Sequence, residues 1–281
     1  MDDRRISRDQ IEGFARMLRR EELRESTIEN YLRHVAALGA WMGDAPVTKE
    51  RVAAWKESLL EGGRCPGTVN SMLVSANRFL AFLGWGDCQV KALRVQRQLF
   101  RENQRELTRG EFDRLIAAAR AAGRERLLLL METICSTGIR VSEVKYITVE
   151  ALRCGKAEIA LKGKIRTILL PARLCRKLLK YCKKRNTVSG EVFLTKNGSS
   201  LSRKQIWAEM KSLCGLAGVA PSKVFPHNLR HLFARAFFKA CRDVAQLADV
   251  LGHSSMETTR IYLISTGAEH ARTLEQLRLV S

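Results

Sequence analysis

The sequence has no hydrophobic run long enough to form a membrane-spanning helix. Its longest strongly apolar stretch, Leu127–Met131, is far shorter than the roughly 20 apolar residues that such a helix needs. The first residues, MDDRRISRDQIEG, also lack the apolar segment of a signal peptide. Together these features predict an intracellular protein with no membrane partner.

The sequence also lacks the common signatures of metal and nucleotide sites. Its 8 cysteines are scattered singly and never form a Cys-x-x-Cys pair, so we expect reduced thiols rather than a zinc site or a disulfide framework. No cluster of Asp and Glu accompanies the cationic candidates described below, although a two-metal nuclease would need one. A Gly-x-x-x-x-Gly-Lys-Ser/Thr loop for ATP is absent as well. We therefore predict no metal and no cofactor.

Negative charge is scarce, and the resulting positive excess is unevenly distributed. The chain of 281 residues has 49 Lys and Arg against 29 Asp and Glu, a net charge of +20. Residues 1–100 hold 16 basic against 13 acidic residues, whereas residues 101–281 hold 33 against 16. Such an excess repels itself unless a polyanion neutralises it, and nucleic acid is the usual polyanion. A basic surface that serves only solubility is the alternative.

Four amphipathic helices are predicted in the first ninety residues. They begin near Ser7, at a capping box formed by Ser26 and Glu29, after Thr48, and after Pro66-Gly67. The polar and basic stretch that follows reads as a linker between domains. We therefore divide the chain into a helical domain (1–90), a linker (91–107) and a second domain (108–281).

The second domain is predicted to be mainly helical with a small sheet. A capping box, Thr108-x-x-Glu111, opens it. Two short β-favouring runs, Ile159–Leu161 and Thr167–Leu170, flank Lys162-Gly163-Lys164 and predict a hairpin. Helices are expected near 109–122, 124–136, 141–147, 172–184, 202–217, 227–240, 243–250 and 255–263. The fold class is thus α+β, mainly α with a small β-hairpin in the C-terminal domain.

His227, Arg230 and His231 are spaced so that they share one face of a helix that begins at Pro226. Histidines clustered with an arginine suit a phosphate or another oxyanion, and a solvated polar face is the alternative. Zinc binding by His227 and His231 is a further alternative. However, Asn228 occupies the position of the glutamate in a metalloprotease motif.

Arg140 lies in a tight connection between two predicted helices, where one guanidinium can be oriented toward a ligand. Gly138 is predicted to end the first helix, and Glu143 could fix the nearby backbone or Arg140 itself. Lys162 lies beside Gly163 at the hairpin tip, from which it could reach a neighbouring groove. An ordinary surface arginine and a solubilising turn lysine are the alternatives.

Four separated motifs, TGIRVSE (137–143), LKGK (161–164), HNLRH (227–231) and LGHSSMETTRIY (251–262), resemble those of the tyrosine recombinases. This is the integrase family that includes the Xer-type enzymes. STIENYLRHVAAL and TVNSMLVSANRFLAFL resemble the family's helical core-binding domain, so the resemblance covers nearly the whole chain. It implies a two-domain, C-shaped DNA clamp. It also implies site-specific recombination through a 3′-phosphotyrosyl intermediate, independent of metal and ATP.

The resemblance implies roles for the cationic residues at the phosphate and the leaving group. Arg140 and Arg230 match the two arginines that clamp the scissile phosphate. Lys162 matches the hairpin lysine that protonates the leaving 5′-oxygen, and Lys164 competes for this assignment. Asn228 replaces the commoner Asp of the family motif, from which we expect a modest effect.

The resemblance also implies roles for the nucleophile and its neighbours. Tyr262 matches the nucleophile, His227 the residue that handles its proton, and His253 the second histidine position, which binds the phosphate. Glu143 matches a supporting acidic position. His231 matches a position that is often histidine but lies outside the core catalytic set.

The implied partners are double-stranded DNA and further copies of the chain. Two duplexes need four strand cuts, so the resemblance implies a dimer on inverted half-sites and a tetramer in the synapse. An accessory directionality factor is an optional partner.

The tail STGAEHARTLEQLRLVS has a helical apolar stripe that we expect to dock on a neighbouring protomer, with packing on its own domain as the alternative. The expected location is the nucleoid in the cytoplasm of a bacterial-type cell.

Two other functions remain open from the sequence. One is a catalytically silent DNA-binding protein of the same fold, although such a protein has no use for Tyr262. The other is a nicking and closing enzyme like the type IB topoisomerases, which the helical N-terminal domain disfavours. The sequence leaves open the DNA target, the biological role, and whether Tyr262 attacks in its own protomer or in a neighbour.

Overall fold

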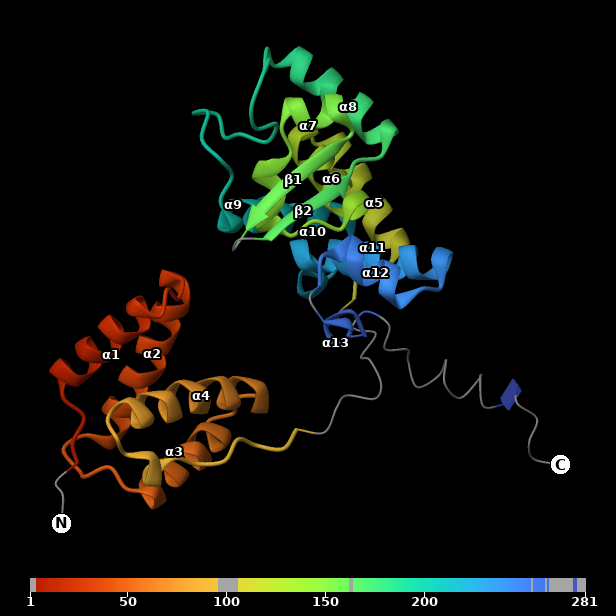
Figure 1. Ribbon diagram of the computed structural model, residues 1–281. Helices are drawn as coiled ribbons and strands as arrows, with labels where there is room; N and C mark the ends of the chain where they lie inside the picture. Colours follow the sequence, from red (N-terminus) through yellow and green to blue (C-terminus); the bar gives the residue numbers. More distant parts are fainter. Residues whose placement is uncertain are drawn as a thin grey trace. The chain divides into compact units, whose positions relative to one another are not determined.

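The computed structural model describes residues 4–95, 106–161, 164–253, 255–260, 262 and 275–276 (Figure 1). The chain divides into two compact units, residues 1–97 and residues 98–281. The division falls within the stretch that the sequence predicts to be a linker, of which residues 96–105 lie outside the described residues. Each unit is described by itself below.

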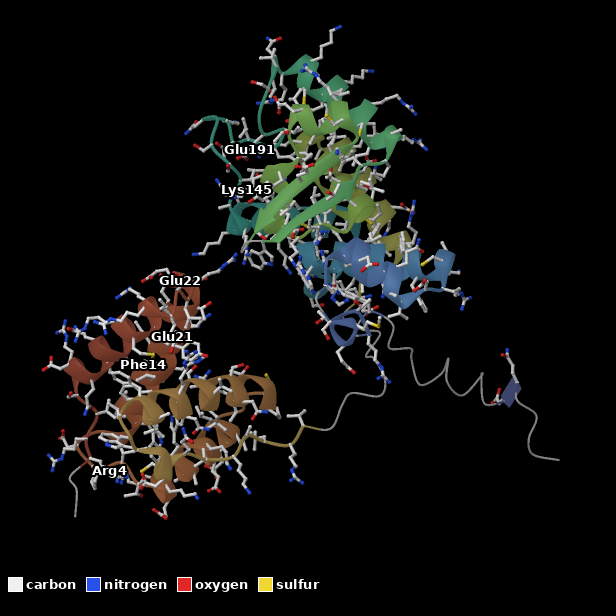
Figure 2. All side chains as sticks on the ribbon, in the orientation of Figure 1. Arg4, Phe14, Glu21, Glu22, Lys145 and Glu191 are labelled. Carbon is white, nitrogen blue, oxygen red and sulfur yellow. The ribbon has the colours of Figure 1, made fainter. Side chains whose placement is uncertain are left out.

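Over residues 4–95 the N-terminal unit has four helices and a short 3₁₀ turn. These are α1 (Arg8–Arg20), α2 (Glu25–Met42), α3 (Lys49–Glu61), α4 (Pro66–Phe82) and η1 (Gly86–Cys88). Phe14, labelled in Figure 2, is fully buried and meets Phe79 edge-on with ring centroids 5.2 Å apart. Asn77 and Asn70 of α4 each exchange two hydrogen bonds with the backbone, of Val90 and Leu93 respectively. The chain therefore stays attached to α4 as far as Leu93.

The predicted capping box at Ser26 is wrong, although the helix it belongs to is present. Helix α2 begins at Glu25, and its N-cap residue is Arg24, which makes no side-chain capping hydrogen bond. The amides of Thr27 and Ile28 donate to the Arg24 carbonyl at 2.8 and 3.0 Å. The first turn thus closes on the backbone of Arg24 and takes Ser26 into the helix.

The C-terminal unit is mainly helical with one two-stranded sheet, as the sequence predicts (Figure 1). Its helices are α5 (Arg109–Ala121), α6 (Glu125–Thr137), η3 (Val141–Tyr146), α7 (Val149–Cys154), α8 (Ala172–Lys184), α9 (Arg203–Lys211), α10 (Cys214–Ala217), η4 (Pro221–Lys223), α11 (Pro226–Cys241), α12 (Val244–Leu251) and α13 (Met256–Arg260). Its strands are β1 (Lys156–Leu161) and β2 (Lys164–Leu169). Within the described residues, no helix has the length and apolar character needed to span a bilayer.

The two strands form the predicted antiparallel hairpin, but both are longer than predicted, and Lys164, predicted in the turn, is the first residue of β2. Their register runs from Lys156 opposite Leu169 to Leu161 opposite Lys164. The two residues between the strands, Lys162 and Gly163, lie outside the described residues. Side chains alternate between the faces of a strand, and the buried Ile168 therefore shares its face with a charged neighbour two residues earlier, Arg166.

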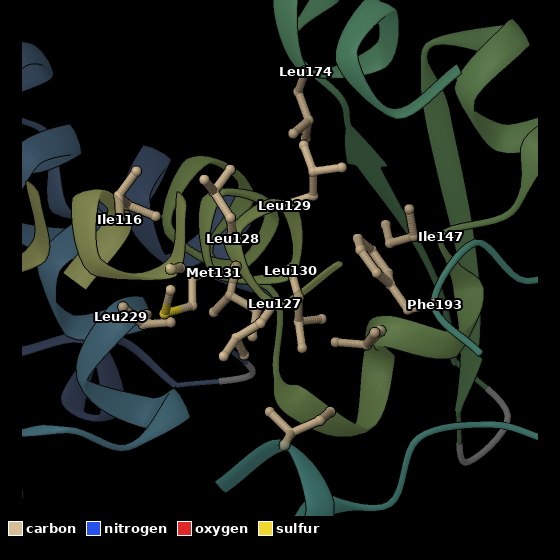
Figure 3. Close-up of a cluster of buried hydrophobic side chains, with 14 of the residues drawn as sticks. Ile116, Leu127, Leu128, Leu129, Leu130, Met131, Ile147, Leu174, Phe193 and Leu229 are labelled. Atoms are coloured by element: carbon tan, nitrogen blue, oxygen red, sulfur yellow. The ribbon is translucent and has the colours of Figure 1, made fainter. Parts of the chain in front are cut away.

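Helix α6 forms the centre of the C-terminal core. Its apolar run, Leu127–Met131, is buried all round, as expected for a helix without a polar face. Figure 3 shows this run enclosed by side chains from several surrounding elements, among them Ile116 of α5, Leu229 of α11 and Phe193. The C-terminal end of α6 is thereby fixed beside α11.

One short helix was not predicted, and two predicted helices differ in extent from the observed ones. Helix α7 was not predicted, because its six residues are too short for a periodic signal. The helix expected over 202–217 is broken into α9 and α10, where the Ser212 hydroxyl donates to the Glu209 carbonyl at 2.8 Å. Helix α13 ends at Arg260 and not beyond Tyr262, whose amide donates to the Thr259 carbonyl at 3.0 Å in a closing turn.

Candidate active site

The site begins at Gly138, which ends helix α6 in a left-handed conformation with φ +65°. Its amide donates to the Ile134 carbonyl at 2.9 Å, as the sequence leads one to expect of a helix-ending glycine. A Cβ atom at this position would lie 2.6 Å from Cε1 of Phe233, which no real contact tolerates. Glycine is therefore required by both its conformation and the space, and the tight turn brings the chain directly to Arg140.

Arg140 is anchored by Glu143 through both its backbone and its side chain. The carboxylate accepts the Arg140 amide at 2.8 Å through Oε2 and the guanidinium at 3.0 Å through Oε1. The Glu143 side chain is only 1% exposed, whereas that of Arg140 is 42% exposed. The buried carboxylate thus holds one edge of a guanidinium that otherwise faces solvent.

Arg230 is a fully buried arginine on α11 that links three separate elements. Its NH1 donates to the Gly138 carbonyl at 2.5 Å, and its NH2 donates to the Leu251 carbonyl at 2.9 Å. The same NH2 lies 2.8 Å from Nε2 of His253. Burial lowers the pKa of Arg230, an effect that the nearby Tyr262 hydroxyl opposes. Its Nε is buried without a hydrogen-bond partner among the described residues.

His253 lies in the turn between α12 and α13, with a hydrogen bond at each ring nitrogen. Nε2 faces the Arg230 guanidinium, and Nδ1 lies 2.8 Å from Oγ1 of Thr259. Burial, followed by the charges of Arg230 and Arg140, lowers the pKa of His253 to about 4. The ring is therefore neutral near pH 7. Thr259 is a buried partner that the sequence did not indicate.

Tyr262 is 5% exposed and packs against three histidine rings of its own chain. Its ring centroid lies 4.6 Å from that of His231, 5.7 Å from that of His253 and 6.2 Å from that of His227. The contact with His253 is stacked, with an interplanar angle of 11°. Its hydroxyl lies near enough to the Arg230 guanidinium to favour the charged form of that group.

His227 and His231 lie on the same face of α11, as their spacing predicts, with ring centroids 4.6 Å apart. Burial, followed by the nearby charges of Arg230 and Arg140, lowers the pKa of His227. His227 is thus held in its neutral, proton-accepting form. Within the described residues, no three His, Cys, Asp or Glu side chains gather as a set of metal ligands.

Arg166 of β2 is a site residue that the sequence interpretation missed. Its side chain is 15% exposed and lies 3.7 Å from the Glu143 carboxylate. It also donates to the Leu251 carbonyl, which Arg230 uses as well. A Cβ at Gly252, where φ is +63°, would lie 2.8 Å from Nε of Arg166. The signal was present, because strand alternation with Ile168 places this charge on the buried face.

A pocket of about 200 Å³ opens beside these residues, with a cationic lining. Arg140, Arg203, His227 and Arg230 contribute to it, and no acidic residue does. Arg203, at the start of α9, was not identified from the sequence. The described part of the chain thus offers several N–H donors to an anion of phosphate size.

Three predicted features lie outside the described part of the chain. Lys162 lies outside the described residues, as does most of the tail that follows Tyr262. The side chain of Lys164 is likewise outside them, although its backbone pairs with Leu161 in the hairpin. The described residues bring together Arg140, Glu143, His227, Arg230, His231, His253 and Tyr262.

Comparisons with known proteins give one consistent family. A model of the phage integrase family matches residues 105–269. The tyrosine recombinase XerA of Pyrococcus furiosus is 26% identical over 288 residues, covering 100% of this chain and 98% of the relative. The tyrosine recombinase XerD of Xanthomonas axonopodis is 32% identical over 177 residues, covering 56% of this chain and 57% of the relative.

Solved structures show the same fold. A lambda integrase fragment (75–356), a dimer bound to a COC′ core site, matches with a TM-score of 0.74 at 18% identity, covering 91% of this chain and 94% of that one. The XerH recombinase on a palindromic difH substrate, after cleavage, matches with a TM-score of 0.73 at 19% identity, covering 97% and 84%.

Proposed function

The chain belongs to the phage integrase family, as a site-specific tyrosine recombinase, and we propose that Tyr262 is the residue with which it cleaves and rejoins DNA. In this reaction a 3′-phosphotyrosyl intermediate forms. The proposal rests on the position of Tyr262 among the rings of three histidines, with its hydroxyl near enough to the Arg230 guanidinium to favour the charged form of that group. A phenol needs a proton acceptor or a cationic neighbour to become a nucleophile, and both lie beside it.

Arg140, Arg203 and Arg230 are proposed to bind the scissile phosphate. All three line one pocket with His227. Guanidiniums donate charge-assisted hydrogen bonds to the non-bridging oxygens, and these bonds strengthen as charge develops in the pentavalent transition state. Nε of Arg230 is a buried donor whose missing partner a phosphate oxygen would supply.

The charge of the arginine cluster around Glu143 supports the same role. Arg140, Arg166 and Arg230 bring three guanidiniums together, and Glu143 is the carboxylate that faces them among the described residues. The surplus of about two positive charges suits a phosphodiester, which carries one negative charge and gains a second in the transition state. We propose that Arg166 contributes to this field without touching the phosphate.

His227 is the proposed acceptor of the Tyr262 proton. The rings of His231 and Tyr262 are closer, but they meet edge-to-face, and His231 does not line the phosphate pocket. His227 lines that pocket and is kept neutral by burial and by Arg230, which lower its pKa. A base must be neutral to take a proton, so His227 fits this role better.

The complete cleavage step balances with protein groups alone. The proton of Tyr262 passes to His227 as the bond from Oη to phosphorus forms and the bond from phosphorus to the 5′-oxygen breaks. The leaving 5′-oxygen takes a proton, for which we propose Lys162 as the donor. Attack by a 5′-hydroxyl on the phosphotyrosyl bond reverses the step, so we propose that neither ATP nor a metal takes part.

Assembly and the roles of the two units are further parts of the proposal. Solved relatives include a lambda integrase dimer on a core site and a lambda integrase tetramer on a Holliday junction. We propose that this chain binds inverted half-sites as a dimer and synapses as a tetramer at the nucleoid. Residues 1–90 would form the core-binding domain and residues 108–281 the catalytic domain of a C-shaped clamp. Docking of the tail on a neighbour belongs to the same proposal.

The function can be tested with DNA captured by the protein itself. Immobilised Tyr262→Phe protein is incubated with fragmented DNA from the source cell, and the retained duplexes are sequenced. Two copies of the captured site are then placed in one plasmid and treated with the wild type. Deletion or inversion of the DNA between the sites supports recombination. Relaxation of any supercoiled plasmid without site-dependent exchange would instead indicate a nicking and closing enzyme.

A further inference from the structure

The two ring nitrogens of His253 face partners with different hydrogen-bonding abilities. A guanidinium can only donate, so Nε2, 2.8 Å from NH2 of Arg230, must be the acceptor. The proton of the neutral ring is therefore on Nδ1, which donates to Oγ1 of Thr259 at 2.8 Å. The observed contacts thus fix one of the two tautomers of His253.

This tautomer is the wrong one for contact with a phosphate. The family resemblance implies that His253 binds the phosphate, where the ring must donate a hydrogen bond to a phosphate oxygen, which can only accept. That contact needs a proton on Nε2, whereas the observed ring carries its proton on Nδ1. A doubly protonated ring would satisfy both sides, but the pKa of His253 is lowered to about 4 by burial and by Arg230, Arg140, Arg166 and His227. A neutral ring must therefore exchange its tautomer.

We propose that Thr259 is a positioning residue whose hydroxyl allows His253 to change tautomer when DNA binds. In the free protein the hydroxyl accepts from Nδ1. With DNA bound, NH2 of Arg230 leaves Nε2 for the phosphate and a phosphate oxygen takes its place. The hydroxyl then turns about its C–O bond and donates to Nδ1 instead. While the partly exposed ring opens transiently to solvent, it takes one proton from water at Nε2 and returns one to water from Nδ1, so it stays neutral. This inference rests on the proposed function and adds a residue to it.

The chemistry of a hydroxyl suits this task better than that of the alternatives. Oγ1 of threonine both donates and accepts, whereas a carboxylate would only accept and would hold the ring in the Nδ1–H form. Thr259 is fully buried, so water does not compete for its hydroxyl. Its carbonyl also accepts the Tyr262 amide at 3.0 Å. One residue thus holds the histidine through its side chain and the proposed nucleophile through its backbone.

The neighbouring Thr258 provides a matched control. It has the same chemistry on the same short helix but is exposed. The test compares Thr259→Val, which keeps the shape and removes the hydroxyl, with Thr259→Ser, which keeps the hydroxyl, and with Thr258→Val. The readouts are ¹⁵N NMR of labelled histidines and single-turnover cleavage of a captured DNA site.

The wild-type spectrum is expected to show His253 protonated on Nδ1 in the free protein and on Nε2 in a complex of Tyr262→Phe with DNA. Thr259→Val should keep the Nδ1–H form in the free protein, where Arg230 still faces Nε2, but should not gain a stable Nε2–H form with DNA. It should cleave about 10- to 100-fold more slowly, the range seen when the hydrogen-bond partner of a metal-bound histidine is removed. Thr259→Ser should restore the rate to within a few-fold, and Thr258→Val should match the wild type.

A wild-type ring that keeps its proton on Nδ1 in the DNA complex overturns the proposal, and so does undiminished cleavage by folded Thr259→Val. The wild-type spectra decide the matter even if Thr259→Val does not fold. A wild type that never links to DNA would contradict the proposed function instead. The tautomer of the free protein could still be measured in that case.

Discussion

The buried carboxylate of Glu143 accepts two hydrogen bonds from Arg140, one from its amide at 2.8 Å and one from its guanidinium at 3.0 Å. This pair ties a helix turn to a side chain that lines the cationic pocket. It also places one negative charge where Arg166 and Arg230 approach from other elements. The stability of the free protein should therefore depend on this single carboxylate.

Glu143→Gln should lower the free energy of unfolding by about 1–3 kcal/mol, because the amide keeps an acceptor but loses the charge that the arginines face. Thermal or urea unfolding measures this loss. Glu158→Gln is the control, since its pair with Lys156 is exposed and 3.8 Å long, and it should change stability by less than about 0.5 kcal/mol. Equal losses of unfolding free energy in the two variants would show that the Glu143 carboxylate stabilises the protein no more than an exposed carboxylate does.

Gly138→Ala should be more destabilising than Gly155→Ala, although both glycines end helices in the left-handed conformation. At Gly155 nothing lies within 4 Å of an added Cβ, so only the conformational cost of about 1–2 kcal/mol applies. At Gly138 the Cβ meets Phe233, which adds about 1–3 kcal/mol of overpacking. Unfolding midpoints in urea compare the two variants, and similar midpoints would contradict the packing at Gly138.

The pH dependence of cleavage should reflect two neutral histidines. Burial and nearby arginines lower the pKa of His227, and lower that of His253 to about 4. When the folded protein lowers the pKa of a histidine, the ring stays neutral below its ordinary pKa of about 6.5. The ring becomes charged only as the pH falls through its lowered pKa in the folded protein. Single-turnover rates should therefore hold between pH 8 and pH 6.5 and decline only below that. An acidic limb centred at or above pH 6.5 would argue against His227 as the base.

Lys162→Ala should slow cleavage of ordinary DNA by about 100-fold or more, since a general acid typically contributes 10²–10⁴-fold. The same variant should cleave DNA with a 5′-bridging sulfur at nearly the wild-type rate, because a thiolate leaves without a proton. Lys164→Ala provides the comparison and should show neither effect. If sulfur rescues Lys164→Ala instead, the general acid is Lys164.

Local signals in the sequence predicted much of the backbone around the site. Gly138, Pro226 and the Thr108 capping box act within a few residues, so the helix ends that they mark could be found without a tertiary structure. The arginine and histidine positions followed from their motifs and helical spacing. Tyr262 beside the three histidines and Arg230 is a tertiary arrangement that spacing alone could not supply.

The residues that were missed depend on contacts between distant segments. Arg166 is part of the site because β2 meets the end of α12 at Gly252, 86 positions further along the chain. Thr258 and Thr259 look equivalent in the sequence, and only the docking of α13 decides which one is buried beside His253. Arg203 joins the pocket through the placement of α9. Such partners are selected by packing and leave a weak local signal.

The central claim, that Tyr262 forms a covalent bond with DNA, is tested most directly with a nicked suicide duplex carrying the captured site. Cleavage releases a short strand that cannot religate, so the linked protein accumulates and is resolved on a denaturing gel. The account predicts a covalent complex with the wild type and with Tyr146→Phe, and none with Tyr262→Phe, which should still bind the duplex. A complex that persists in Tyr262→Phe, or a wild type that binds the site without ever linking to it, would contradict the account.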